Sequence, residues 1–132
     1  MKQMDAQRAP WARRGRLALA LAGLALLAAC GAQRAQSLAR EQMGQAVYEA
    51  ALATLDEALR HHPEDLPLRG QWLRARAEAL SRLVARAAAE RAAGRLPEAE
   101  SLLQRAAKLD PDSARVRDLL QALDQERRQA QA

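Results

Sequence analysis

The sequence predicts an all-α fold, and three features of the chain carry that prediction. Helix-favouring residues, chiefly Ala, Leu, Arg, Glu and Gln, dominate its 132 residues, whereas strand formers are scarce and both Phe and Ile are absent. Apolar residues recur at spacings of three and four along most of the chain. Prolines and glycines divide these stretches into separate segments. We therefore expect about four helices packed as antiparallel hairpins, with a long second helix.

The first expected helix begins near Ser37 and ends at His61. It ends there because Pro63 follows shortly after, and the residue before a proline disfavours the α region. Gly44 is a weak point within the helix, since glycine is a poor helix former. The apolar stripe of this helix comprises Val47, Tyr48, Ala51, Leu52, Leu55, Ala58 and Leu59.

The second expected helix covers residues 67–93. Asp65 is placed to cap its N-terminus, Pro67 is tolerated in its first turn, and Gly94 follows its last turn as a left-handed cap. A helix of this length spans about 40 Å. Its apolar residues recur every seven positions, at Leu73, Leu80 and Ala87. A split near Ser81 into two helices is the alternative, although the residues around Ser81 do not favour a turn.

Two shorter helices are expected after Gly94. Pro97 opens the first of them, and a turn over residues 110–113 separates it from the second. Their apolar faces comprise Leu96, Ala99, Leu102, Leu103 and Ala106 in one helix, and Val116, Leu119, Leu120 and Leu123 in the other. The chain is polar from Gln125 onward, so we expect the helical domain to cover residues 37–128, with a frayed tail over 129–132.

The residues before Cys30, the only cysteine, have the organisation of a signal peptide. Five Lys and Arg residues in the first 16 positions precede an apolar run of 13 residues from Leu17 to Ala29. This run is shorter than the roughly 20 residues that a membrane-spanning helix needs. The sequence L-A-A-C-G over residues 27–31 resembles the lipobox of bacterial lipoproteins.

The lipobox resemblance implies a covalent lipid anchor at Cys30. In that family the cysteine sulfur takes a diacylglycerol, the preceding peptide is removed and the new amino terminus is acylated, which gives durable membrane attachment. Gly31 stands where an aspartate would favour the inner membrane, so the resemblance implies an outer-membrane location facing the periplasm. An ordinary secretory signal with a free cysteine, an uncleaved anchor and a twin-arginine signal at Arg13-Arg14 are the alternatives.

The chain thus divides into a signal peptide over residues 1–29, an acylated cysteine with a polar tether over 30–36, and the helical domain. Residues 30–132 have 16 basic and 15 acidic side chains, because the expected signal peptide holds most of the excess positive charge. This near balance argues against a nucleic-acid partner. No cysteine besides Cys30 exists to form a disulfide, so the domain relies on packing alone.

An internal repeat becomes visible when the chain is shifted by 48 residues. The aligned pairs include Tyr48 with Leu96, Ala51 with Ala99, Leu55 with Leu103, Ala58 with Ala106 and Pro63 with Pro111. The stretch Gly94–Pro111 resembles the tetratricopeptide repeat, which has a glycine, two alanines seven apart and a proline at these relative positions. The period of that family is about 34 residues, so we interpret the additional residues as two heptads within the second helix. A chance helical hairpin rich in alanine is the alternative, because Ala46 replaces the glycine in the first copy.

Nothing in the sequence indicates catalysis. His61 and His62 lie near Glu64 and Asp65, but adjacent side chains beside a proline diverge, whereas metal ligands must converge. We interpret them as a solvated turn and expect no metal, no cofactor and no enzymatic activity. The arginines of the second helix are expected to form a solvated face, with an acidic partner or anionic lipid headgroups as the alternative, and they comprise Arg69, Arg74, Arg76, Arg82, Arg86 and Arg91.

The resemblance to the tetratricopeptide repeat implies a binding function. Repeats of this family bind extended or helical peptides on a concave face that is lined by the first helix of each repeat. The residues expected on that face are Trp72, Arg76, Ala79 and Leu83 from the second helix, with Arg117 and Gln121 from the fourth. Core filling is the alternative role for Trp72. We expect a lipid-anchored adaptor that binds a protein or peptide partner in envelope assembly, or alternatively a spacer lipoprotein that self-associates into homo-oligomers.

Overall fold

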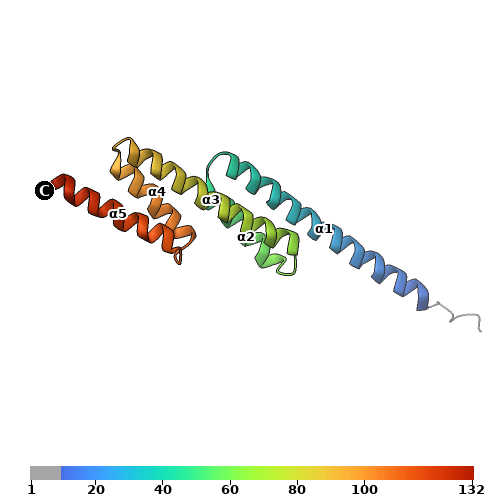
Figure 1. Ribbon diagram of the computed structural model, residues 1–132. Helices are drawn as coiled ribbons and strands as arrows, with labels where there is room; N and C mark the ends of the chain where they lie inside the picture. Colours follow the sequence, from blue (N-terminus) through green and yellow to red (C-terminus); the bar gives the residue numbers. More distant parts are fainter. Residues whose placement is uncertain (1–9) are drawn as a thin grey trace, which may run out of the picture.

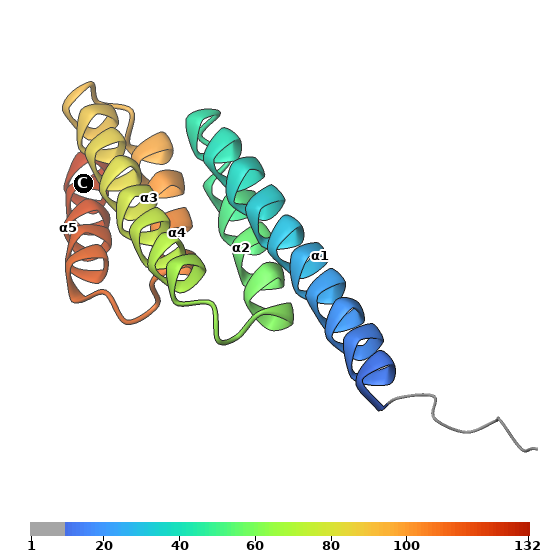
Figure 2. The same cartoon turned by 90° about the vertical axis from the view of Figure 1, so that its right-hand side faces the viewer.

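The computed structural model describes residues 10–132, which form five α helices and no strand over that range (Figure 1). The helices are α1 (Pro10–Gly44), α2 (Tyr48–His61), α3 (Leu66–Ala92), α4 (Leu96–Leu109) and α5 (Ala114–Gln131). Consecutive helices run antiparallel, so α1, α3 and α5 point the same way (Figures 1 and 2). The all-α class is confirmed. The N-terminal part of the expected signal peptide, residues 1–9, lies outside the described residues.

The expected helix from Ser37 to His61 is interrupted, which corrects the expected number of helices. The chain reverses between Gly44 and Tyr48, where Ala46 adopts a left-handed backbone with φ of 59°. The amide of Val47 donates a hydrogen bond of 2.9 Å to the carbonyl of Gln42 and closes the turn. This reversal lays α2 against α1 and allows Tyr48 to be buried.

The long second helix of the prediction is confirmed as α3. The carboxylate of Asp65 accepts a hydrogen bond of 2.9 Å from the amide of Leu68, and Pro67 lies in the first turn. The helix continues without a break to Ala92, and Gly94 follows in the left-handed region with φ of 75°. The alternative of a split near Ser81 is therefore wrong.

The 48-residue internal repeat is confirmed by the backbone. The helices α2 and α4 each contain 14 residues, and their first residues lie 48 positions apart. The turns before them match as well, since the amide of Val47 donates to Gln42 and the amide of Arg95 donates to Glu90, both at 2.9 Å. Ala46 occupies the left-handed position that Gly94 occupies in the second copy.

The core consists of small and medium side chains where the five helices meet. Alanines are among its most buried members, so the helix axes can approach closely. The buried residues from Tyr48 onward are Tyr48, Ala51, Leu52, Leu55, Ala58, Leu68, Ala75, Ala79, Leu83, Val84, Ala87, Ala99, Leu102, Leu103, Ala106, Val116 and Leu123. They come from α2, α3, α4 and α5, and α1 adds Ala39 and Met43 to the same cluster.

The N-terminal part of α1 projects away from the other helices (Figures 1 and 2). All the side chains described before Cys30 are exposed, whereas Ala32 is only 5% exposed. Residues 30–36, expected as a tether, are helical, and the carbonyl of Gln36 accepts a hydrogen bond of 3.1 Å from Gln71 Nε2. At the other end, α5 continues to Gln131 through most of the expected frayed tail. Among the described residues, no helix has the length and apolar character needed to cross a membrane.

The left-handed turn at Ala46 generates a stability prediction. Ala46→Gly should raise the free energy of unfolding by about 0.5–1 kcal/mol, because glycine relieves the backbone strain at positive φ. The greater conformational entropy of glycine in the unfolded chain offsets part of this gain. Gly94→Ala should lower it by about 1 kcal/mol, since a Cβ there meets no atom within 4 Å and only backbone strain acts. Urea unfolding followed by circular dichroism measures both changes.

A matched control for this prediction is Ala77→Gly in the exposed middle of α3. This control should cost about 1 kcal/mol, because glycine weakens a helix interior. Destabilisation by Ala46→Gly to the same extent as Ala77→Gly would contradict the left-handed turn.

Candidate functional site

Two grooves flank α3 on the side that it shares with α1 and α5. The first is a cavity of about 720 Å³ between α1 and α3, and the second is a cavity of about 420 Å³ between α3 and α5. The three helices that form them run in the same direction (Figure 2). We call the surface that α1, α3 and α5 form at these grooves the inner face.

The first groove has an apolar floor and a positively charged rim. Its floor includes the buried residues Ala39, Leu55 and Ala75. Its polar lining residues are Gln36, Arg40, Gln71, Arg74, Glu78 and Arg82. Three of these side chains are positively charged and one is negatively charged. The groove therefore favours acidic groups in a partner.

Local contacts hold part of this rim in place. Arg82 pairs with Glu78 one turn earlier on α3 at 2.6 Å, and Arg40 donates a hydrogen bond of 3.3 Å to Ser37 Oγ. The hydrogen bond from Gln71 to the carbonyl of Gln36 joins α3 to α1 across the groove. The two walls of the groove are thus tied together directly.

The second groove is more apolar and is closed at its rim by an ion pair. Its floor includes Leu103 and Leu123, which are buried. Arg91 on α3 donates a hydrogen bond of 2.7 Å to Glu126 on α5. This hydrogen bond lowers the pKa of Glu126 from its ordinary value and holds both side chains charged across the groove.

A row of small side chains runs from the middle to the end of α3, and its members Ala88 and Ala92 line the second groove. These residues follow the helical spacing of three and four, so they lie on one face. They are Ala77, Ser81, Ala85, Ala88 and Ala92. Because these side chains are short, the backbone of a peptide or helix can approach this face of α3 closely.

The residues predicted for the binding face of α3 lie on another side of that helix. Arg76 donates hydrogen bonds of 2.9 Å to the carbonyl of Leu109 and of 2.7 Å to Asp110, and its guanidinium lies 5.4 Å from the centre of the Trp72 ring. Ala79 and Leu83 are 0% and 1% exposed, so a partner cannot reach them. The prediction of Ala79 and Leu83 as contact residues is corrected.

Trp72 is partly buried against the core, as its alternative role predicted. Its Nε1 atom is buried and has no hydrogen-bond partner among the described residues. Neither Trp72 nor Arg76 lines either of the two grooves. Arg76 joins α3 to the end of α4 through Leu109 and Asp110, which gives it a structural role.

The predicted residues of α5 are exposed but lie away from the second groove. That groove is lined from α5 by Arg115, Leu119, Leu123 and Glu126. Arg117 and Gln121 are each two positions from such a residue, and two positions on a helix correspond to a turn of about 200°. The structure therefore places them on the outer side of α5.

The sequence analysis missed the groove residues Arg40, Gln71 and Glu78. It treated Arg74 and Arg82 as part of a solvated face. One sequence signal could have indicated this face, namely the row of Ala and Ser residues opposite the apolar stripe of α3. An exposed row of small residues marks a face that another chain can approach.

The ion pair between Glu49 and Arg105 connects α2 to α4, which are the equivalent helices of the two copies. Arg105 Nε lies 2.7 Å from Glu49 Oε1, and its second nitrogen lies 2.9 Å from Oε2, so the pair is bidentate. The hydrogen bond from Arg105 lowers the pKa of Glu49, and the pKa of Arg105 is raised. This contact helps to fix the angle between the copies and hence the shape of the inner face.

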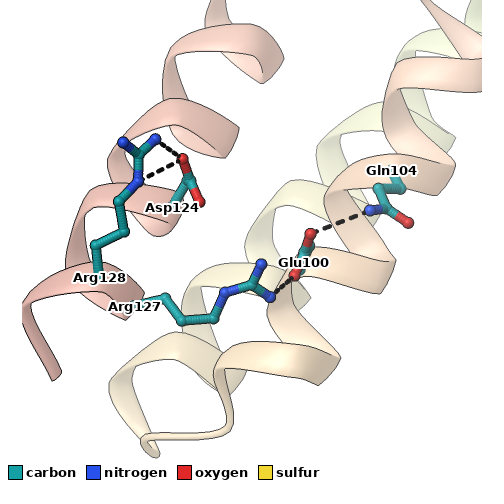
Figure 3. A network of polar contacts seen from close by, with 5 residues as sticks. All are labelled: Glu100, Gln104, Asp124, Arg127 and Arg128. Atoms are coloured by element: carbon teal, nitrogen blue, oxygen red, sulfur yellow. Dashed lines mark hydrogen bonds and ion pairs between the residues drawn. The ribbon is translucent and has the colours of Figure 1, made fainter. Parts of the chain in front are cut away.

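A polar network connects α5 to α4 (Figure 3). Arg127 on α5 pairs with Glu100 on α4, and Glu100 also accepts a hydrogen bond of 3.2 Å from Gln104. Within α5, Arg128 Nε donates a hydrogen bond of 3.1 Å to Asp124. The network lies at the edge of the α4–α5 contact and helps to fix α5, which forms the wall of the second groove.

The histidine turn does not assemble a metal site in the part of the chain that the structure describes. His61 Nε2 lies 2.9 Å from Glu57 Oε1, one helical turn away. Among residues 10–132, no three His, Cys, Asp or Glu side chains are grouped as a metal ion would require.

Comparison with known proteins identifies one repeat. The family model of the tetratricopeptide repeat matches residues 80–123, which cover the C-terminal half of α3, all of α4 and the beginning of α5. No curated protein and no solved structure matches the chain. The fold is an all-α helical repeat of tetratricopeptide type, and such repeats are protein-interaction modules. The match begins 14 residues after the start of α3, so the first half of this helix lies outside the matched repeat.

The Glu49–Arg105 pair generates the second prediction. A double-mutant cycle with Glu49→Gln and Arg105→Gln should give a coupling energy of about 0.5–1 kcal/mol, because both side chains are partly exposed to solvent and salt screens them. The pKa of Glu49 is lower in the folded state. Its contribution should therefore be present above the unfolded pKa and disappear as the pH falls through the folded pKa.

Chemical unfolding of the four proteins near neutral pH and at acid pH tests this prediction. The exposed pair Asp124–Arg128 within α5 is the control, with an expected coupling of about 0.3–0.5 kcal/mol. A coupling for Glu49 and Arg105 that is zero, or that is unchanged at acid pH, would contradict the proposed contact.

Proposed function

We propose that this protein is a lipid-anchored adaptor, facing the periplasm, that binds a protein or peptide partner on the inner face of α1, α3 and α5. The observation that carries the proposal is the pair of grooves along this face, about 720 and 420 Å³ in volume. Their apolar floors and charged rims fit a binding surface of a helical repeat. The role is non-catalytic and belongs to envelope assembly.

The partner is expected to be an extended or helical segment with acidic side chains. The first groove is lined by three arginines, Arg40, Arg74 and Arg82, and by one glutamate, Glu78. Arg74 forms no ion pair among the described residues, so its guanidinium is available to a carboxylate. The row of small side chains from Ala77 to Ala92 allows the backbone of the segment to approach α3.

The membrane anchor is proposed at Cys30, within the L-A-A-C-G sequence. Among the described side chains, burial begins at Ala32, after the expected cleavage point. Removal of residues 1–29 would thus take away none of the buried side chains that the structure describes. The absence of an aspartate after Cys30 supports the outer membrane as the location.

A self-associating spacer is the second candidate function, and one exposed leucine favours it. Leu73 continues the seven-residue recurrence of Leu80 and Ala87, yet its side chain is 54% exposed. A second copy could cover it. Sedimentation of the domain without its signal peptide distinguishes the candidates, since a spacer must associate, and replacing Leu73 with Glu should then dissociate it.

The anchor generates the third prediction. Cys30→Ser should abolish the incorporation of an alkyne palmitate analogue and release the protein from membranes or leave it unprocessed. The reason is that the serine hydroxyl does not replace the thiolate nucleophile. In-gel fluorescence after metabolic labelling measures incorporation, with Ser37→Ala on the same helix as the control. Equal labelling of the wild type and Cys30→Ser would contradict the anchor.

The inner face generates the fourth prediction. A photo-crosslinking amino acid at Arg74, in the first groove, should give discrete adducts with a partner in intact cells. The same amino acid at Gln121, on the outer side of α5, should give few. Immunoblotting after irradiation compares the two positions. Strong adducts from Gln121 and none from Arg74 would move the binding site to the outer face of α5.

A further inference from the structure

The helix α1 connects the acylation site directly to the folded core. It continues without interruption through Cys30 and Ala32 to Gly44. Ala32 is buried two residues after the cysteine, and Gln36 is hydrogen-bonded to α3 through Gln71. No flexible spacer therefore separates the lipid from the repeat domain, and the anchor should hold the domain against the membrane in a restricted orientation.

The turn between α2 and α3 lies beside this starting point. Ala29 and Ala32 of α1 line a cavity of about 340 Å³ together with residues 61–65 of the turn. A Cβ placed on Gly31 would lie 3.9 Å from His62 Nε2. The turn is on the side of the domain toward which α1 projects (Figures 1 and 2). Any surface that reaches Cys30 must therefore also lie near this turn.

The side chains at this end suit a lipid–water interface. Leu66, the first residue of α3, is 72% exposed, and Pro63 and Pro67 beside it are exposed as well. Arg60 and Arg69 are exposed on the flanking helices. Arg60 is paired with Glu57, and the turn also contains the exposed Glu64, so Arg69 is the cation beside the apolar tip. An apolar tip beside a cation matches the boundary between acyl chains and phosphate headgroups.

We propose that the α2–α3 turn, residues 61–66, is a membrane-docking surface that contacts phospholipid headgroups when Cys30 is acylated, an inference that rests on the lipid anchor proposed above. Leu66 enters the interface, and Arg69 meets a phosphate group. The opposite turn at Ala93 points toward the periplasm, because α3 carries it about 40 Å from Leu66 along the helix axis. The first groove, which Leu66 and Pro67 line at one end, then begins at the membrane surface and extends away from it along α3.

The experiment uses the mature lipoprotein, purified from membranes and reconstituted into vesicles of phosphatidylethanolamine and phosphatidylglycerol. Because Cys30 is the only cysteine and its sulfur is acylated, a new cysteine takes up a fluorophore selectively. The fluorophore is placed at Glu64→Cys in the docking turn or, as a matched control, at Ala93→Cys in the distant turn. A lipid with a spin-labelled headgroup quenches the fluorophore at short range. Flotation of the vesicles reports the attachment separately.

The expected result is flotation of both proteins, with severalfold stronger quenching at position 64 than at position 93. A long Gly-Ser linker inserted between Gly31 and Ala32 should keep flotation and remove the difference, because it frees the domain from the surface. Flotation with equal quenching at both positions would overturn the docking surface and leave the anchor standing. Loss of flotation would overturn the anchor and the docking surface with it.

Discussion

The structure depends on α3 keeping one apolar face along all 27 of its residues. Leu68 and Ala75 in its first half and Leu83 and Ala87 in its second half belong to one core cluster, and α3 contacts α1, α2 and α4 along its length. Two heptads added to a helix rotate its apolar face by only about 40° in total, so the face stays continuous. A different insertion length would turn one half of α3 away from its neighbours, and the two copies of the repeat would no longer share a core.

The sequence could predict the features of the fold that depend on local signals. The class, the unbroken α3 and the 48-residue repeat follow from punctuation and from apolar spacing, which are local signals. The turn at Ala46 carries a weaker signal, because Gly44 alone is only a weak point in a helix and alanine stands at the left-handed position that Gly94 occupies in the second copy. The tertiary packing of Tyr48 and Met43 against the core decides that turn, and a helix-propensity argument does not include it.

Two of the residues predicted for the binding face of α3, Ala79 and Leu83, are buried for a related reason. The predicted residues lie on the side of α3 that also carries its buried apolar residues, and such a side is usually packed in the core. They are Trp72, Arg76, Ala79 and Leu83. The inner face differs from this side in having only small side chains along one row of α3, from Ala77 to Ala92. Its charged rim also depends on Arg40, which only the packing of α1 brings near Arg74.

The continuity of α3 determines the inner face, because residues from both halves of this helix line the two grooves. A direct measurement is the distance between spin labels at Arg74 and Ala92, which are exposed and lie 18 residues apart, or five full turns, on the same side of α3. With Cys30 replaced by serine, pulsed electron paramagnetic resonance should give one narrow distribution near about 27 Å. A clearly shorter distance, or two populations, would show a break in α3 and contradict the shared core of the two copies.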